Sequence, residues 1–189
     1  MSRPGWFVFG VIVGVVVVVP LGAYLFAKFG GIAMATTAKP LPLEETFAKT
    51  ALHASEGGAA KVQDPFPPSD ANLLAGAHVY VENCAMCHGL PGHSKTRIAT
   101  GEFPPPPQLF QANEMVTDDP EGITHWKVAH GIRLSGMPGF GSTLSDAEQW
   151  QVTMLLKRAD KLPPAVQAVL AKGEWENSEQ QRENSAAKR

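Results

Sequence analysis

The feature that most constrains this chain is the segment Cys84-Ala85-Met86-Cys87-His88. A Cys-x-x-Cys-His pattern is typical of a site that attaches haem covalently. The spacing suits that chemistry, because two intervening residues let one helical turn project both thiols and the imidazole toward the same macrocycle. The pattern therefore predicts one haem c, held by thioether bonds from Cys84 and Cys87, with His88 as an iron ligand.

Two other uses of a paired cysteine motif are less consistent with this chain. A zinc site needs about four ligands, and the chain has no cysteine beyond Cys84 and Cys87. A thioredoxin-like dithiol needs a βαβ context, which the hydrophobic pattern does not show. Haem attachment would use both thiols and leave none for a disulfide.

An uncharged apolar run from Phe7 to Ala27 predicts a membrane-spanning helix. At ~1.5 Å per residue, its length matches the roughly 30 Å hydrocarbon core of a bilayer. The run exceeds the about 7–15 residues of a signal-peptide core, although cleavage after Ala35 remains an alternative. We expect an uncleaved anchor over residues 1–29. Arg3 precedes it, and the positive-inside tendency, which Lys28 on the far side weakens, then places the haem domain in the periplasm or its equivalent, tethered to the membrane.

The remaining chain divides into three segments by composition. Residues 30–69 form an Ala/Pro-rich spacer, with a short helix expected over 42–55. Residues 70–171 form the compact haem domain, and the polar residues 172–189 predict a disordered tail. The net charge of -2 excludes the basic surface of a nucleic-acid-binding protein.

Helical patterns within 70–171 predict three main helices. The first has an apolar stripe with helical spacing, begins with Asp70 as N-cap and leads into Cys84. The second has Asp119 as N-cap and Pro120 as its first residue. The third opens with a capping box at Ser145 and is closed by Pro163-Pro164, after which residues 165–170 could add a last turn. Between the first and second helices, residues 89–115 are expected to be irregular.

The sixth coordination position of a haem iron requires a second ligand, and Met137 is the predicted one. It lies in a glycine-bounded loop between two helices, where a core methionine is less expected. Met86 is fixed beside the attachment site, and Met154 belongs to a helix stripe. A thioether ligand favours ferrous iron and raises the reduction potential. His125 and His130 could supply bis-histidine ligation instead, but we assign them to core or surface roles.

Several motifs occur in a fixed order between residues 70 and 161. They are Gly76-x-x-x-Tyr80 before the Cys84 motif, the proline run before Gln108-Leu109, Trp126 through Gly131-Ile132-Arg133, Gly136 to Gly141, and Leu144 to Trp150. In this order they resemble a class I mono-haem cytochrome c of the bacterial membrane-anchored type.

The resemblance implies an all-α class I cytochrome c fold, with a few helices around one covalent haem. It implies that the first and last helices cross, with Gly76 and Tyr80 against Trp150 and Met154. It also implies that a proline carbonyl, somewhere in Pro104 to Pro107, orients the His88 imidazole.

Two further residues gain a possible role from the same resemblance. Trp126 and Arg133 are candidates for contact with the haem propionates. Their alternative roles are a core aromatic residue and a solvated charge.

With both axial positions filled, we expect a one-electron carrier in a respiratory chain and not an enzyme. The expected partners are a membrane oxidase, a dehydrogenase or another cytochrome, with the lipid bilayer contacted through residues 7–27. Two alternatives remain. The chain could be the haem subunit of a membrane dehydrogenase or oxidase complex, or a haem sensor or peroxidase-like protein if Met137 is not a stable ligand.

Overall fold

The computed structural model describes residues 3–173, so most of the tail predicted over 172–189 lies outside the described residues. The chain divides into two compact units, Met1–Phe47 and Ala48–Arg189. Each unit is described by itself.

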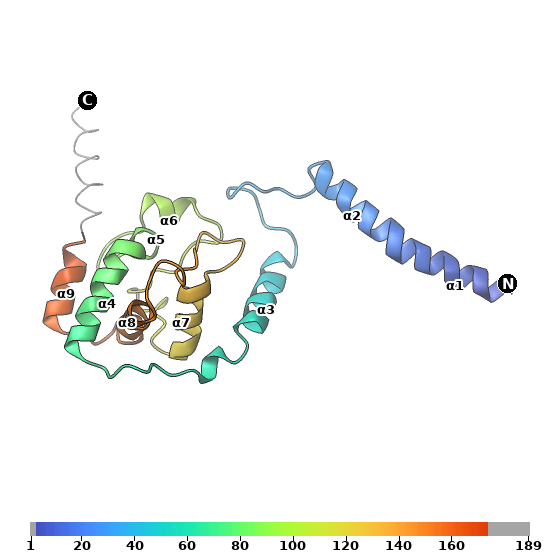
Figure 1. Cartoon of the computed structure of the whole chain (residues 1–189). Helices are drawn as coiled ribbons and strands as arrows, with labels where there is room; N and C mark the ends of the chain where they lie inside the picture. The colour runs from blue at the N-terminus through green and yellow to red at the C-terminus, as the bar shows by residue number, and fades with distance from the viewer. Residues whose placement is uncertain (1–2, 174–189) are drawn as a thin grey trace, which may run out of the picture. The chain divides into compact units, whose positions relative to one another are not determined.

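The first unit contains one apolar helix near the N-terminus. It consists of α1 (Arg3–Val13), a π-helical stretch (Gly14–Val18) and α2 (Val19–Lys28), which follow one another without a break (Figure 1). An 18-residue window within Gly5–Lys28 has a mean hydropathy of 2.6, and none of that window is buried. The helix is long and apolar enough to cross a membrane, a property that signal sequences share. The π-helical stretch ends two residues before Pro20, which cannot donate a backbone hydrogen bond to the turn before it.

The helix expected over 42–55 is α3 (Glu44–Glu56). Gly57 follows it with a φ of +51°, a left-handed conformation that commonly ends a helix. A short 3₁₀ turn, η2 (Ala59–Lys61), comes next. The boundary between the two units therefore falls within α3.

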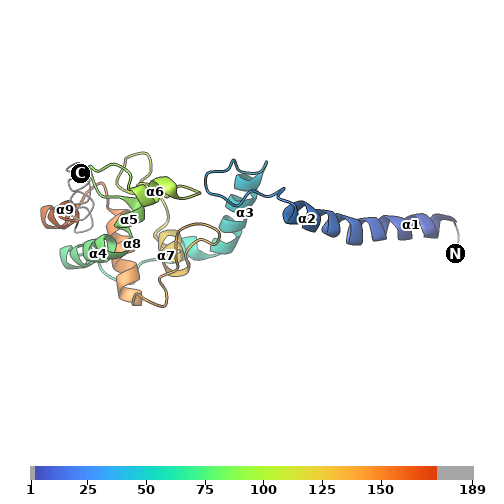
Figure 2. The same cartoon turned by 90° about the horizontal axis from the view of Figure 1, so that it is seen from above.

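The second unit is helical. After α3 and η2, its α-helices in chain order are α4 (Asp70–Asn83), α5 (Ala85–His88), α6 (Arg97–Gly101), α7 (Glu121–His130), α8 (Asp146–Lys157) and α9 (Pro164–Ala171). No strand occurs among residues 3–173, so the expected all-α class is confirmed (Figures 1 and 2).

The core of the second unit forms where α4 crosses α8. Tyr80 of α4 and Met154 of α8 are buried in the same hydrophobic cluster. At the crossing, a Cβ added to Gly76 would collide with the carbonyl of Gln151. The close approach expected at this glycine is therefore present, and the atoms nearest to it belong to the backbone at Gln151 and Val152.

The capping box at the start of α8 is confirmed. The Glu148 backbone N–H donates to Ser145 Oγ at 3.3 Å, and the Ser145 backbone N–H donates to the Glu148 carboxylate at 2.7 Å. The expected N-cap of α4 was wrong by one residue. Ser69 holds that position, because its Oγ accepts the Asn72 N–H at 3.2 Å. Asp70 is the first helical residue, where its negative charge interacts favourably with the helix dipole.

One expectation about a proline also needs correction. Pro120 is the N-cap of α7 and not its first residue, so the helix begins at Glu121. The last turn expected after Pro163-Pro164 is α9, which Pro164 opens, because a proline at the first helical position loses no hydrogen bond. Val166 and Leu170 of α9 are fully buried, so this helix contributes to the core.

The end of α3 and the η2 turn pack directly on α7. A Cβ added to Gly122 would overlap the carbonyl oxygen of Ala59. Lys127 Nζ lies 3.4 Å from the buried Glu56 carboxylate. The Asp64 backbone N–H donates at 2.8 Å to the carboxylate of Glu121, the first residue of α7. The last part of the expected spacer is therefore built into the second unit, and we call residues 48–64 the arm.

Candidate haem site

The Cys84–His88 motif forms a single helical turn at the end of α4. The Cys84 backbone N–H donates to Tyr80 O at 2.8 Å, so the first cysteine continues the hydrogen bonding of α4. The His88 N–H then donates to Cys84 O at 2.9 Å and closes the turn. Both cysteines are half-buried free thiols. The turn has the local geometry that its spacing predicted.

The environment of the two thiols keeps them protonated. Burial raises the pKa of Cys84 to about 12. Burial, and then a hydrogen bond to Glu102, raises the pKa of Cys87 to about 11. A reactive redox dithiol needs a lowered thiol pKa. Among residues 3–173, no three His, Cys, Asp or Glu side chains are grouped so that they could hold a metal ion. These observations favour haem attachment over the dithiol and zinc alternatives.

The His88 ring is held by one carbonyl of the proline run. Its Nδ1 lies 2.8 Å from Pro107 O, and because a carbonyl only accepts, Nδ1 carries the proton. Burial lowers the pKa of His88, and the Pro107 contact opposes that effect in part. The neutral ring therefore keeps the lone pair on Nε2, the atom that would bind iron. Of the four prolines left open by the sequence, Pro107 makes this contact.

The Met137 loop folds back onto the end of α7. Gly131 begins it with a φ of +67°. The Ile132 N–H donates to Met137 O at 3.1 Å, and the Phe140 N–H donates to Val128 O at 2.9 Å. These contacts fix the backbone of the loop at both ends. The Met137 side chain that the loop carries is half-buried.

One acidic side chain connects this loop with the Cys84–His88 motif. The Cys87 thiol lies 3.4 Å from Glu102 Oε1. A Cβ added to Gly136 would lie 2.7 Å from the same carboxylate. The structure thus brings the motif and the Met137 loop within reach of one side chain. Sequence reasoning missed Glu102, although it is the only acidic residue between His88 and the proline run.

The alternative histidine ligands are engaged with aromatic neighbours. The His125 ring stacks on Trp150 with centroids 3.9 Å apart and an interplanar angle of 13°. The His130 ring stacks on Trp126 at 4.8 Å and 18°. His130 Nδ1 lies 2.9 Å from Trp126 O. Both rings therefore have structural roles, which agrees with their assignment to core or surface.

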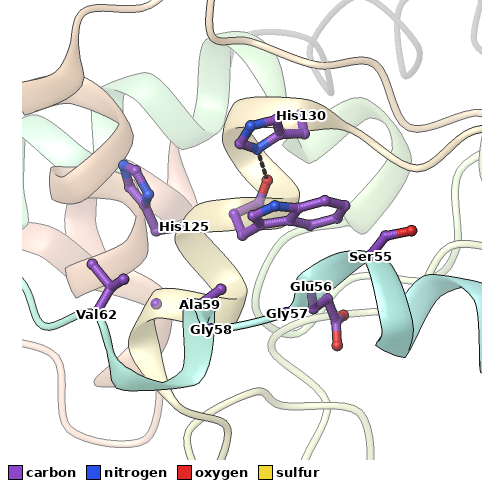
Figure 3. Close-up of a pocket in the computed structure, with 10 residues that line it drawn as sticks. Ser55, Glu56, Gly57, Gly58, Ala59, Val62, His125 and His130 are labelled. Atoms are coloured by element: carbon purple, nitrogen blue, oxygen red, sulfur yellow. Dashed lines mark hydrogen bonds between the residues drawn. The ribbon is translucent and has the colours of Figure 1, made fainter.

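Trp126, His125 and His130 also line a cavity of about 350 Å³ between α7 and the arm (Figure 3). Figure 3 shows the arm residues from Ser55 to Val62 along one side of this cavity. Arg133 lies exposed in the loop after α7. Contact of Trp126 or Arg133 with a haem propionate stays a prediction.

The residues of the site fit a covalently bound haem. Two thiols and an imidazole whose Nδ1 is held by Pro107 occupy one turn, and the thioether side chain of Met137 belongs to the loop that Glu102 connects to that turn. Thioether formation consumes neutral thiols, and haem iron accepts the imidazole and thioether ligands.

Comparison with known proteins gives two matches. Residues 71–154 match the family described as "Cytochrome C oxidase, cbb3-type, subunit III". Residues 71–154 are a cytochrome c domain. Haem is therefore the cofactor that the family implies, and the match of these residues is consistent with the expected class I cytochrome c.

A relative from Gluconobacter oxydans (strain 621H) is named "Alcohol dehydrogenase (quinone), cytochrome c subunit". It is 34% identical over 92 residues, which cover 44% of this chain and 18% of the relative. The chain thus spans less than a fifth of the curated relative that it matches. No solved structure matches.

Proposed function

We propose that this chain is a one-electron carrier that holds a single haem c through Cys84 and Cys87, with His88 and Met137 as axial ligands. The observation that carries the proposal is the contact between His88 Nδ1 and Pro107 O at 2.8 Å. It gives the histidine of a Cys-x-x-Cys-His turn the tautomer and the fixed orientation that an iron ligand needs.

The bound haem supplies a reversible one-electron change at its iron. The chain's residues keep the surroundings of that iron constant. Pro107 prevents rotation of the His88 ring, and the backbone contacts of Ile132 and Phe140 hold the Met137 loop. Two neutral ligands favour the ferrous state and raise the reduction potential. With both axial positions filled, no position remains for a substrate, which supports electron transfer as the function.

The apolar helix supports a second part of the proposal. We infer that Gly5–Lys28 remains as an uncleaved anchor and contacts lipid through residues 7–27. Arg3 on its N-terminal side then favours a haem domain on the periplasmic face of the bacterial inner membrane. Within this proposal, residues 1–29 are the anchor, residues 30–69 connect it to the haem domain over 70–171, and Trp126 and Arg133 approach the haem propionates.

A second candidate function is that of a haem subunit within a larger dehydrogenase complex. The specific observation in its favour is the relative from Gluconobacter oxydans, whose printed name is that of a cytochrome c subunit of a quinone alcohol dehydrogenase. The electron-transfer chemistry is the same in both candidates. Detergent extraction of the native membrane followed by size-exclusion chromatography distinguishes them, because a subunit elutes with its complex and a free carrier elutes alone.

Substitution of Met137 tests the axial ligand and the sensor or peroxidase alternative. In the wild-type protein we expect low-spin ferric haem with a methionine–iron charge-transfer band, and no carbon monoxide binding after reduction. Met137→Ala should lose that band, lower the reduction potential and bind carbon monoxide. Optical spectroscopy and a redox titration measure these properties.

Met86→Ala is the matched control, because Met86 belongs to the attachment motif but its side chain is 50% exposed. It should retain the band and the wild-type potential. A wild-type protein with high-spin haem that binds carbon monoxide would contradict the carrier function and support a sensor or peroxidase-like role.

A further inference from the structure

The residue after Pro107 makes an unusual set of contacts for a loop side chain. Gln108 is only 2% exposed. Its Nε2 donates to Cys87 O at 3.1 Å and to Pro106 O at 3.2 Å. Both partners are carbonyls, which only accept, so they fix which end of the amide is the nitrogen. The side chain thereby joins the end of the proline run to the attachment motif.

The backbone around Gln108 is fixed by two further hydrogen bonds. Its own N–H donates to the Glu114 carboxylate. The N–H of Leu109 donates to His88 O at 3.3 Å. The peptide groups on both sides of Gln108 are therefore held, and the Pro107 carbonyl lies within this fixed segment.

A third contact connects Gln108 with the core. Gly89 follows the motif with a φ of +72°, and a Cβ added there would collide with Gln108 Oε1. The buried Tyr80 hydroxyl donates to Gly89 O at 2.8 Å. The amide of Gln108 thus packs against a glycine whose own position is set from α4.

We propose that Gln108 is a positioning residue for the axial histidine, because its side-chain amide holds the Pro107 carbonyl against His88 Nδ1. This inference rests on the proposed function, in which His88 binds the haem iron. A hydrogen bond to Nδ1–H raises the basicity of an imidazole ligand. A more basic ligand stabilises ferric iron and lowers the reduction potential. Loss of the Gln108 amide should therefore raise the potential.

The test is Gln108→Leu in the full-length protein, which removes both donors at similar side-chain size. We expect haem attachment and the methionine–iron band to persist, the potential to shift upward, and the His88 Nδ1–H to exchange with solvent roughly tenfold faster. Redox titration and NMR of the Nδ1–H measure these two quantities. Gln111→Leu is the matched control, because Gln111 is an exposed glutamine three residues along the same loop. It should change neither quantity.

A Gln108→Leu protein that carries haem, with the wild-type potential and exchange rate, would overturn the inference. If that variant does not accumulate, Gln108→Asn replaces it, since a shorter amide keeps the donors but cannot span both carbonyls. Its potential should shift in the same direction by a smaller amount, and an unchanged potential would overturn the inference equally. Absence of the histidine–methionine signature in the wild-type protein would instead count against the proposed function.

Discussion

Neutral side chains in partly buried positions set the chemistry at the scale of residues. Burial raises the pKa of both thiols and lowers the pKa of the His88 imidazole. His125 is a second partly buried imidazole, and its ring stacks on Trp150. Charging such a ring costs solvation free energy in the folded state alone. The stability of the domain should therefore respond to mild acid.

Stability between pH 7.5 and 5 tests this effect at His125. Burial is the main cause that lowers the pKa of His125 below 6.5, and Asp146 opposes it in part. The unfolded state then binds more protons, so the stability contribution is complete above about pH 6.5 and is lost as pH falls through the folded-state pKa. His125→Phe keeps an aromatic ring but cannot charge, so it should lose less stability on acidification. Denaturant unfolding at both pH values measures the difference.

The control for this prediction is His78→Gln, because His78 is exposed on α4. It should leave the pH dependence as it is in the wild-type protein. If the wild-type and His125→Phe proteins lost equal free energy of unfolding on acidification, His125 would not contribute to the pH dependence, and the prediction would be wrong.

The glycine at the helix crossing gives a second prediction at this scale. Gly76→Ala places a methyl group against the Gln151 carbonyl, so α4 and α8 must separate. The overpacking should cost about 1–3 kcal/mol, although alanine favours a helix over glycine by about 1 kcal/mol. Gly101→Ala is the control, since a Cβ there meets no atom within 4 Å. Thermal or denaturant unfolding of the two variants should show destabilisation only at Gly76.

At the scale of elements, the arm has become part of the haem domain. It contacts α7 through the Gly122 approach and through the ion pair between Lys127 and Glu56. A protein that begins at residue 65 should be roughly 1–3 kcal/mol less stable than one that begins at residue 48. Unfolding of the two haem-loaded proteins by denaturant measures this difference. Equal stability would show that the arm only rests on the domain.

Elements with strong local signals were predictable from sequence, and those that depend on distant contacts were not. The capping box at Ser145 and the turn at Cys84–His88 are set by residues a few positions apart. The helix α6 spans only Arg97–Gly101, too short for a hydrophobic period. The packing of the arm on Gly122 joins parts of the chain that no local pattern relates.

The same distinction applies to the site. The pattern supplied the cysteines and His88, because their spacing itself encodes the geometry. It could not choose among four consecutive prolines, since identical residues carry identical signals. Pro107 is distinguished by the contact of its carbonyl with His88 Nδ1, in a segment that Gln108 joins to the motif. Glu102 likewise acquires its position from the fold and not from its neighbours in sequence.

At the scale of the whole molecule, the arm shortens the part of the chain that can act as a tether. Residues 29–43 lie between α2 and α3. At about 3.5 Å each they extend at most about 50 Å. If the N-terminal helix is retained in the membrane, this length limits how far the haem domain can move between electron donor and acceptor.

The central claim is that Cys84 and Cys87 hold a single haem covalently, and the intact mass of the denatured protein tests it most directly. Full-length protein is purified from bacterial membranes with a functional cytochrome c maturation system, then treated with acidified acetone. We expect the mass of the polypeptide plus one haem, with all haem retained by the protein. The mass of the unmodified polypeptide, with the haem released into the acetone, would contradict it.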